Sequence, residues 1–272
     1  MKPETNDYVT SQGELDVVSS TSTLLKTSNQ LAKSSQRITP QLLVSVRNRD
    51  ELAAAMAGGV DIVDLKEPRR GALAPADVEL WSHAASLWWE LRPSSLLSAA
   101  LGEQADAIRV AGRLPPAFAF AKVGPSGCSS ADAISDLWAV VRQRLDDRIE
   151  LVAVAYADFQ AAGSHPPEAI FRLAAEAGFS RCLIDTYVKD GRSTLDHLGM
   201  DGLVSLAKVA RKAGLWWTLA GSIRVDCVSL LRQHAVLPDC FGVRGDVCRR
   251  GRAGTLSGER LTVWKESLLQ RC

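Results

Sequence analysis

The chain has 272 residues, of which 46% are hydrophobic and 23% charged, as in ordinary soluble globular proteins. Its 32 Lys and Arg nearly balance 31 Asp and Glu, so a formal net charge of +1 excludes the broad basic surface that gathers nucleic acid or coats anionic membranes. No run approaches the ~18 consecutive apolar residues of a transmembrane helix. The polar opening of residues 1–6 lacks the features of a secretory signal, and we therefore expect a cytoplasmic protein.

The cysteines give no sign of a metal site or a disulfide framework. They are scattered without a C-x-x-C pair, at positions 128, 182, 227, 240, 248 and 272. The four histidines likewise lack the spacing of metal ligands. We expect reduced thiols that mostly fill the core, no metal and no cofactor.

Residues 1–40 differ in composition from the rest of the chain. They hold seven Ser and six Thr and few large apolar side chains, which is too little apolar material to offset the entropy of ordering the chain. The composition predicts a disordered extension here and one catalytic domain over residues 41–272. The alternative is a helix around Ser22 to Lys33 that packs on the core.

Short apolar runs alternate with amphipathic segments from Gln41 to the C-terminus, which is typical of α/β proteins. Eight runs are predicted strands: Leu42 to Val46, Asp61 to Leu65, Ser95 to Ala100, Ala117 to Val123, Glu150 to Ala155, Arg181 to Asp185, Leu215 to Leu219 and Cys240 to Val243. Eight strand-helix units predict a (β/α)₈ TIM barrel. The alternative is an open doubly wound sheet, but no G-x-G-x-x-G follows the first strand.

Boundary residues support the helices between these strands. Asn48 and Glu51 have the spacing of a capping box after the first strand. The pair Pro166-Pro167 is suited to open a helix that Gly178 closes, and Gly214 follows the basic end of another.

Lysines stand at the predicted ends of three different strands, where TIM barrels place their active sites. Side chains alternate along a strand, so Asp64 and Lys66 point into the mouth if Val63 and Leu65 pack under helices. Lys122 ends the fourth strand, and Lys189 follows Asp185 at the end of the sixth.

The chain has 23 Arg and only nine Lys, so lysines at strand ends are notable. An amine can lose its proton and attack a carbonyl, whereas a guanidinium cannot. A second cation nearby and partial burial favour the neutral amine. Lys66 is therefore a candidate Schiff-base residue, and Asp64 and Asp185 are candidates for proton transfer. The alternative is that these groups form salt bridges or simply bind an anion.

The last two predicted strand-helix loops have the features of a phosphate site. Gly221 and Ser222 lie between the seventh strand and its helix, and Gly242, Arg244 and Gly245 lie at the end of the eighth strand. Glycines let backbone N–H groups approach an anion, and Arg244 is expected to add a bidentate contact. The basic run of residues 249–252 is either a solvated face, a second phosphate contact or a lid.

Six segments in order resemble the (5-formylfuran-3-yl)methyl phosphate synthase family. They are 64–73 (DLKEPRRGAL), 121–124 (AKVG), 156–158 (YAD), 183–191 with LIDT and KDG, 219–223 (LAGSI) and 242–245 (GVRG), within residues 41–270. The chain departs from the family pattern at Ala74, where a glycine is expected, and in its N-terminal 40 residues.

The resemblance implies a TIM barrel that joins two molecules of glyceraldehyde 3-phosphate into 4-(hydroxymethyl)-2-furancarboxaldehyde phosphate, with loss of one phosphate and two waters. This product supplies the furan of methanofuran. By resemblance Lys66 is the Schiff-base lysine, with Lys122, Lys189, Asp64 and Asp185 around it. The expected partner is a phosphorylated small molecule, and a homo-oligomer is left open. The alternatives are a related Schiff-base aldolase with another phosphorylated aldehyde and a non-catalytic barrel that binds a phosphorylated metabolite.

Overall fold

The computed structural model describes residues 39–270. The predicted extension of residues 1–40 lies outside this range except for Thr39 and Pro40, as do the alternative helix at Ser22 to Lys33 and Cys272. These expectations stay predictions.

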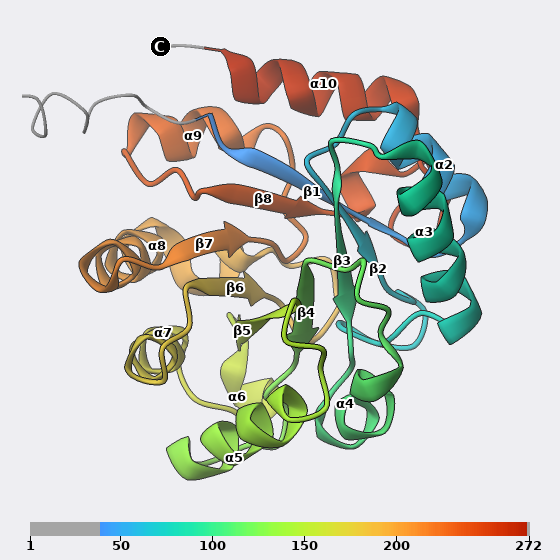
Figure 1. Cartoon of the computed structure of the whole chain (residues 1–272). Helices are drawn as coiled ribbons and strands as arrows, with labels where there is room; N and C mark the ends of the chain where they lie inside the picture. Colours follow the sequence, from blue (N-terminus) through green and yellow to red (C-terminus); the bar gives the residue numbers. More distant parts are fainter. Residues whose placement is uncertain (1–38, 271–272) are drawn as a thin grey trace, which may run out of the picture. The chain divides into compact units, whose positions relative to one another are not determined.

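Eight parallel strands close into a barrel in the described part of the chain (Figure 1). The strands are β1 (Gln41–Val46), β2 (Ile62–Leu65), β3 (Leu96–Ala100), β4 (Phe120–Val123), β5 (Glu150–Tyr156), β6 (Arg181–Asp185), β7 (Trp216–Leu219) and β8 (Cys240–Val243). Each strand pairs with the next, and β8 closes the ring on β1 with Leu43 opposite Gly242. The predicted TIM barrel is confirmed, and the open sheet is wrong because β1 is hydrogen-bonded on both edges.

Helices alternate with the strands around the outside of the barrel. They are α2 (Arg49–Ala57), α3 (Val78–Leu91), α4 (Gln104–Val110), α5 (Ala131–Arg142), α6 (Phe159–Ala162), α7 (Pro167–Glu176), α8 (Thr194–Ala213), α9 (Cys227–Gln233) and α10 (Gly258–Leu269), with short 3₁₀ turns η2 (Ala111–Arg113) and η3 (Gly245–Val247). Pro167 opens α7 and Gly214 ends α8 in the left-handed conformation, as predicted.

The predicted capping box at the start of α2 is only half formed. The Asn48 side chain accepts from the backbone N–H of Glu51 at 2.9 Å, which is the expected N-cap. The Glu51 carboxylate accepts from the N–H of Arg47 instead of reaching back to Asn48. Glu51 is 4% exposed because it serves a buried ion pair described below.

Apolar side chains form one layer between the barrel and the helices and a second layer inside the barrel. Val63 and Leu65 belong to the outer layer, whereas Ile62 belongs to the inner one, so the predicted alternation along β2 is confirmed. Each fully buried aliphatic side chain contributes about 1.5–3 kcal/mol to folding. This alternation aims Asp64 at the barrel interior, where it is 1% exposed.

The described cysteines are all unbonded thiols, and most are buried. Burial raises the pKa of Cys240 to about 12 and that of Cys227 to about 11, so both stay protonated near neutral pH. This agrees with a role as core fillers. Within residues 39–270, no helix is both long and apolar enough to cross a bilayer.

Candidate active site

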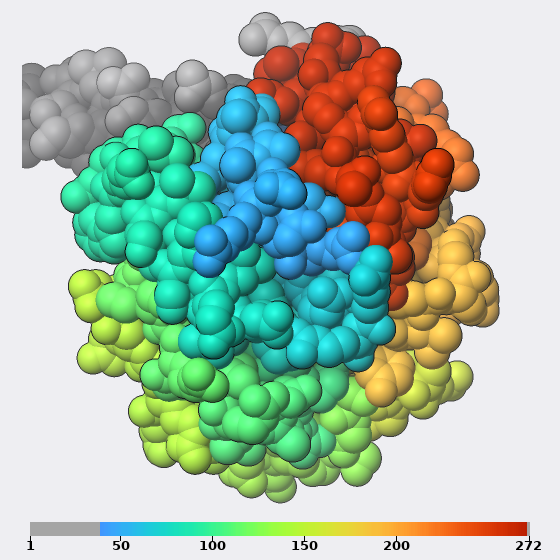
Figure 2. Space-filling model, turned by 90° about the vertical axis from the view of Figure 1, so that its right-hand side faces the viewer, coloured from blue at the N-terminus to red at the C-terminus, as the bar shows by residue number. Residues whose placement is uncertain are grey.

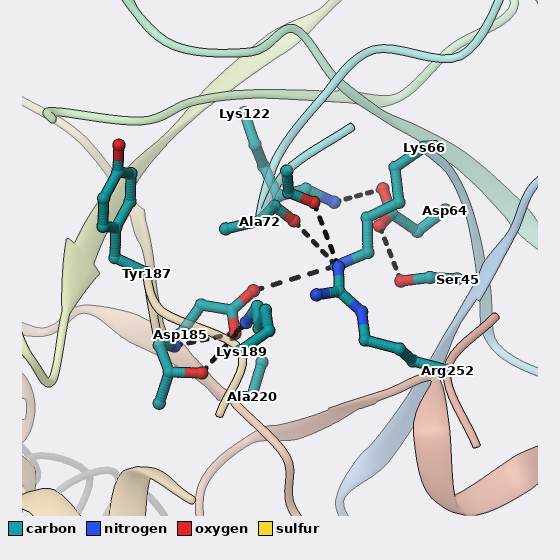
Figure 3. Close-up of polar contacts among 12 residues, drawn as sticks. Ser45, Asp64, Lys66, Ala72, Lys122, Asp185, Tyr187, Lys189, Ala220 and Arg252 are labelled. Carbon is teal, nitrogen blue, oxygen red and sulfur yellow. Dashed lines mark hydrogen bonds and ion pairs between the residues drawn. The ribbon is translucent and has the colours of Figure 1, made fainter. Parts of the chain in front are cut away.

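All ten predicted site residues line one cavity of about 740 Å³, formed where the strands end. They are Asp64, Lys66, Lys122, Asp185, Lys189, Gly221, Ser222, Gly242, Arg244 and Gly245. Parallel strands bring their carboxyl ends to one edge, so residues far apart in sequence meet there. Figure 3 shows the three lysines and two aspartates pointing toward one another.

Asp64 and Lys122 form a buried ion pair at the floor of this cavity. Strand register places Ser45, Asp64 and Ser98 side by side on β1, β2 and β3. Ser45 donates to Asp64 at 3.0 Å, and Lys122 donates to Ser98 at 2.9 Å. Burial lowers the pKa of Lys122, and Asp64 partly opposes this shift. Both charges are therefore held in place by the barrel itself.

Asp185 lies between two other lysines. Lys189 Nζ is 2.7 Å from its carboxylate and Lys66 Nζ is 3.8 Å away, while the N–H of Thr186 donates to it at 2.8 Å. Burial by itself raises the pKa of Asp185, but Lys189 and Lys66 outweigh burial, so the net pKa is lowered. The pKa of Lys189 is lowered, chiefly by burial. Asp185 is thus an ionised carboxylate within reach of two amines.

The loop between β2 and α3 covers Lys66. Lys66 is 8% exposed, and its ammonium donates to the carbonyl of Ala72 at 3.2 Å. The loop folds back so that Lys66 and Pro75 form an antiparallel bridge. Ala74, which replaces the expected glycine, keeps a negative φ, so the alanine fits without backbone strain.

The loop after β7 is pressed against the end of β6. Gly221 has φ +87°, and a Cβ there would lie 2.8 Å from the amide nitrogen of Thr186 and would collide with the Thr194 hydroxyl. Ser222 follows with φ +53°. The N–H groups of Ser222 and Ile223 have no acceptor among the described residues, and both residues line the cavity. The phosphate site expected here rests on these loop amides, since the short helix α9 starts only at Cys227.

The expected bidentate contact of Arg244 with phosphate is not supported by its geometry. Arg244 is 7% exposed, and all five of its N–H groups are used within the protein. It forms an ion pair with Glu51, and donates to the carbonyls of Ser45 at 2.9 Å, Arg252 at 2.8 Å and Gly254 at 2.9 Å. A buried guanidinium with no free donor clamps loops together, and its contact with phosphate stays a prediction.

Sequence reasoning missed a carboxyl-phenol pair at the carboxyl ends of two other strands. Glu103, just after β3, accepts from the hydroxyl of Tyr156 at the end of β5 and from the N–H of Ser126 at 3.0 Å. A Cβ at Gly124 would collide with the Glu103 carboxylate, which explains the glycine that ends the AKVG segment. Burial raises the pKa of Glu103 and that of Tyr156. Glu103 also follows a strand end, so the reasoning that found the lysines could have found it.

Replacing Glu103 by Gln is expected to change how stability depends on pH. The folded-state pKa of Glu103 is raised, so the wild type is most stable below the ordinary glutamate pKa and loses stability as pH rises through the raised value. Gln keeps hydrogen-bonding capacity and carries no charge. We expect the variant to gain melting temperature relative to the wild type as pH rises above about 4, the ordinary glutamate range, measured by thermal unfolding.

The exposed Glu90, changed to Gln, is the matched control, because it removes the same charge from the surface. A constant difference in melting temperature between Glu103→Gln and the wild type across this pH range would contradict the prediction.

The basic run predicted as a solvated face, phosphate contact or lid divides into two parts. Arg249 and Arg250 are exposed and lie outside the cavity lining, whereas Arg252 is half-buried and lines it. Arg252 donates to the carbonyl of Gly71 at 3.0 Å, which joins the β8–α10 loop to the β2–α3 loop. Figure 2 shows the molecule from the right-hand side of Figure 1. In this view the β2–α3 segment (cyan) and the segment after β8 (red) lie against each other.

A closed barrel with a lysine-lined cavity at the carboxyl ends of its strands is the arrangement typical of TIM-barrel enzymes. The chain belongs to the 4-HFC-P synthase family, whose family model matches residues 42–265. The family suggested by the six sequence segments is thereby confirmed.

Two similar proteins cover most of this chain and nearly all of their own length. The (5-formylfuran-3-yl)methyl phosphate synthase of Methanothermobacter thermautotrophicus is 32% identical over 228 residues, which is 79% of this chain and 92% of that protein. The protein of the same name from Archaeoglobus fulgidus is 28% identical and covers 84% of this chain and 99% of its own.

Solved structures share the barrel at low identity. A 3-hexulose-6-phosphate synthase superposes with a TM-score of 0.52 at 13% identity, covering 84% of this chain and 99% of its own. The phosphoribosyl anthranilate isomerase of Thermus thermophilus gives a TM-score of 0.53 at 15% identity, covering 84% and 98%. At these identities the likeness shows the fold alone.

Proposed function

We propose that this protein is a lyase that condenses two molecules of glyceraldehyde 3-phosphate into 4-(hydroxymethyl)-2-furancarboxaldehyde phosphate. The reaction releases one phosphate and two waters and proceeds through a Schiff base on Lys66. Its product would supply the furan of a methanofuran-type one-carbon carrier. Family membership and relatives named for synthesis of this furan phosphate support the proposal.

The arrangement of the three cavity lysines carries the assignment of Lys66. Lys122 is in a close ion pair with Asp64, and Lys189 contacts Asp185 at 2.7 Å. Lys66 is 3.8 Å from the carboxylate it shares with Lys189, and its other contact is a neutral carbonyl. An amine in a weaker ion pair loses less interaction energy when it gives up its proton and attacks an aldehyde. Lys66 is therefore the lysine best suited as nucleophile.

Asp185 is suited to accept and pass on the protons of Schiff-base formation. It is ionised, and it lies between the amine that must lose a proton and Lys189, which can donate one. A carboxylate this close to Lys66 can accept the proton that leaves the attacking amine. Lys189 can then protonate the hydroxyl that departs as water when the carbinolamine becomes an imine.

The imine makes the neighbouring carbon acidic, so that carbon can add to the second aldehyde before phosphate leaves by elimination. Two phosphorylated trioses carry anionic groups that the cavity must hold. The loop amides of Ser222 and Ile223, for which residues 39–270 offer no acceptor, are suited to one phosphate. The Asp64–Lys122 pair lines the same cavity as a buried polar group.

The deciding experiment is incubation of the purified protein with glyceraldehyde 3-phosphate alone. We expect a growing ultraviolet band of a conjugated furan aldehyde, with the product mass confirmed by mass spectrometry and one phosphate released per furan. A Lys66 adduct trapped by borohydride without a furan would favour a Schiff-base aldolase with another aldehyde. A folded protein that gives neither product nor adduct would reject the proposed function.

A further inference from the structure

The charges around Lys66 do not cancel. Three lysines and the half-buried Arg252 face two carboxylates, those of Asp64 and Asp185, along the cavity wall. The lining also includes the exposed Arg224, which pairs with Asp226, and the exposed Arg260, which donates to backbone carbonyls. Arg244 adds nothing to this surplus, because Glu51 neutralises it. Asp246 also lines the cavity, but its carboxylate is held by the N–H of Val225 at 2.9 Å and by Trp264 at 2.8 Å. A surplus of buried cations is stable only with an anion nearby.

Arg252 is a half-buried guanidinium of the cavity wall with donors to spare. One of its N–H groups binds the carbonyl of Gly71 at 3.0 Å, and the described residues offer no acceptor for the others. It is half-buried beside the cavity, and it is close enough to Lys189 and Asp185 to influence their electrostatics. A planar guanidinium with free parallel N–H groups matches the geometry of a phosphate.

Arg244 and Glu51 hold the backbone of the loop that carries Arg252. Arg244 donates to the carbonyl of Arg252 at 2.8 Å and to that of Gly254 at 2.9 Å, while Glu51 holds Arg244 through both carboxylate oxygens. The loop is therefore fixed before any ligand arrives. Preorganisation lowers the entropy cost of binding, since the ligand does not have to order the loop.

We propose that Arg252 is the side-chain ligand of a substrate phosphate and selects phosphorylated over unphosphorylated aldehydes, with Arg244 as its positioning residue. The inference rests on the proposed function and adds the residue that sets its substrate class. The same guanidinium holds Gly71, so a phosphate bound there also secures the loop that carries Ala72 over Lys66. Phosphate recognition and coverage of the nucleophile are thereby coupled.

A competition for Lys66 tests the inference. The protein is given equal amounts of glyceraldehyde 3-phosphate and carbon-13-labelled glyceraldehyde, and the imines are reduced with borohydride. Mass spectrometry of the Lys66 peptide gives the ratio of the two adducts, and the label separates glyceraldehyde from any triose that has lost its phosphate. A ratio within one sample does not depend on how much of a variant is folded.

Arg252→Ala and Arg252→Gln are expected to lower the preference for the phosphorylated aldehyde roughly 10- to 100-fold, the value of a lost charge-assisted contact. Gln can keep a donor for Gly71 without the charge, so it separates phosphate binding from loop closure. Arg249→Ala, in the same loop but outside the cavity lining, is the matched control and should keep the wild-type ratio. An unchanged ratio in both Arg252 variants would overturn the inference.

Inorganic phosphate provides a test that does not involve Lys66 chemistry. Isothermal titration calorimetry should show at least tenfold weaker phosphate binding by Arg252→Ala than by Arg249→Ala. Equal affinities would overturn the role of Arg252 even if the furan is formed. Absence of any Lys66 adduct in the wild type, with phosphate binding that depends on Arg252, would reject the proposed function and leave the phosphate ligand assigned.

Discussion

Lys66→Arg is expected to abolish furan formation, with a loss in rate on the order of 10³-fold or more. The guanidinium keeps the positive charge that faces Asp185, so the ion pair and the fold should survive. It cannot lose a proton to become a nucleophile, because its pKa stays above about 12. The variant thus removes covalent chemistry while leaving the electrostatics of the cavity largely in place.

Two measurements separate this outcome from a structural effect. Borohydride trapping should label the wild type and leave Lys66→Arg unlabelled, while circular dichroism and melting temperature stay close to wild type. Lys208→Arg, an identical change at an exposed position on α8, should keep full activity. Activity near that of the wild type in Lys66→Arg would show that another group is the nucleophile.

Gly221→Ala is expected to lower stability by about 2–5 kcal/mol although it adds a single methyl group. Its φ of +87° is unfavourable for any residue with a Cβ, and the added methyl would meet the Thr186 amide nitrogen at 2.8 Å. That nitrogen belongs to the backbone beside Asp185, so it cannot move without disturbing the carboxylate. Activity should fall together with stability.

Gly178→Ala isolates the backbone contribution to this effect. Gly178 has a similar φ of +81°, but a Cβ there meets nothing within 4 Å. We expect this variant to lose only the strain of about 1–2 kcal/mol and to keep its activity. Chemical denaturation of both variants measures the difference. Equal losses in the free energy of unfolding would show that the loop after β7 can relax away from β6, so that the added methyl group avoids the Thr186 amide.

The barrel could be predicted because its physical cause is local. Each strand is a short apolar run, each helix has a boundary residue such as Pro167 or Gly214, and these signals do not depend on distant contacts. The alternation of Val63 and Asp64 placed the carboxylate inside for the same reason. The fourth strand begins at Phe120 instead of Ala117, since strand ends are set by pairing with neighbours.

The cavity residues were also predictable, because a barrel brings every strand end to one face. Lysines at the ends of β2 and β4 and beyond β6 had to approach one another once the ring closed. Their pairing was not predictable: Asp64 takes Lys122 from two strands away and leaves Lys66 to share Asp185 with Lys189. Side-chain reach in three dimensions decides this, and spacing along the chain carries no information about it.

By itself the sequence determined the eightfold repeat, the face of each strand, the set of strand-end lysines and aspartates, and the family to which their order belongs. Only the tertiary structure decided which cations are free. Arg244 and Arg252 are both arginines of the last loop, yet Glu51, 193 residues from Arg244 in the chain, neutralises one and leaves the other facing the cavity. The difference between the two arginines comes from contacts between residues far apart in the chain. A buried guanidinium has to donate its N–H groups to the acceptors that the fold places around it.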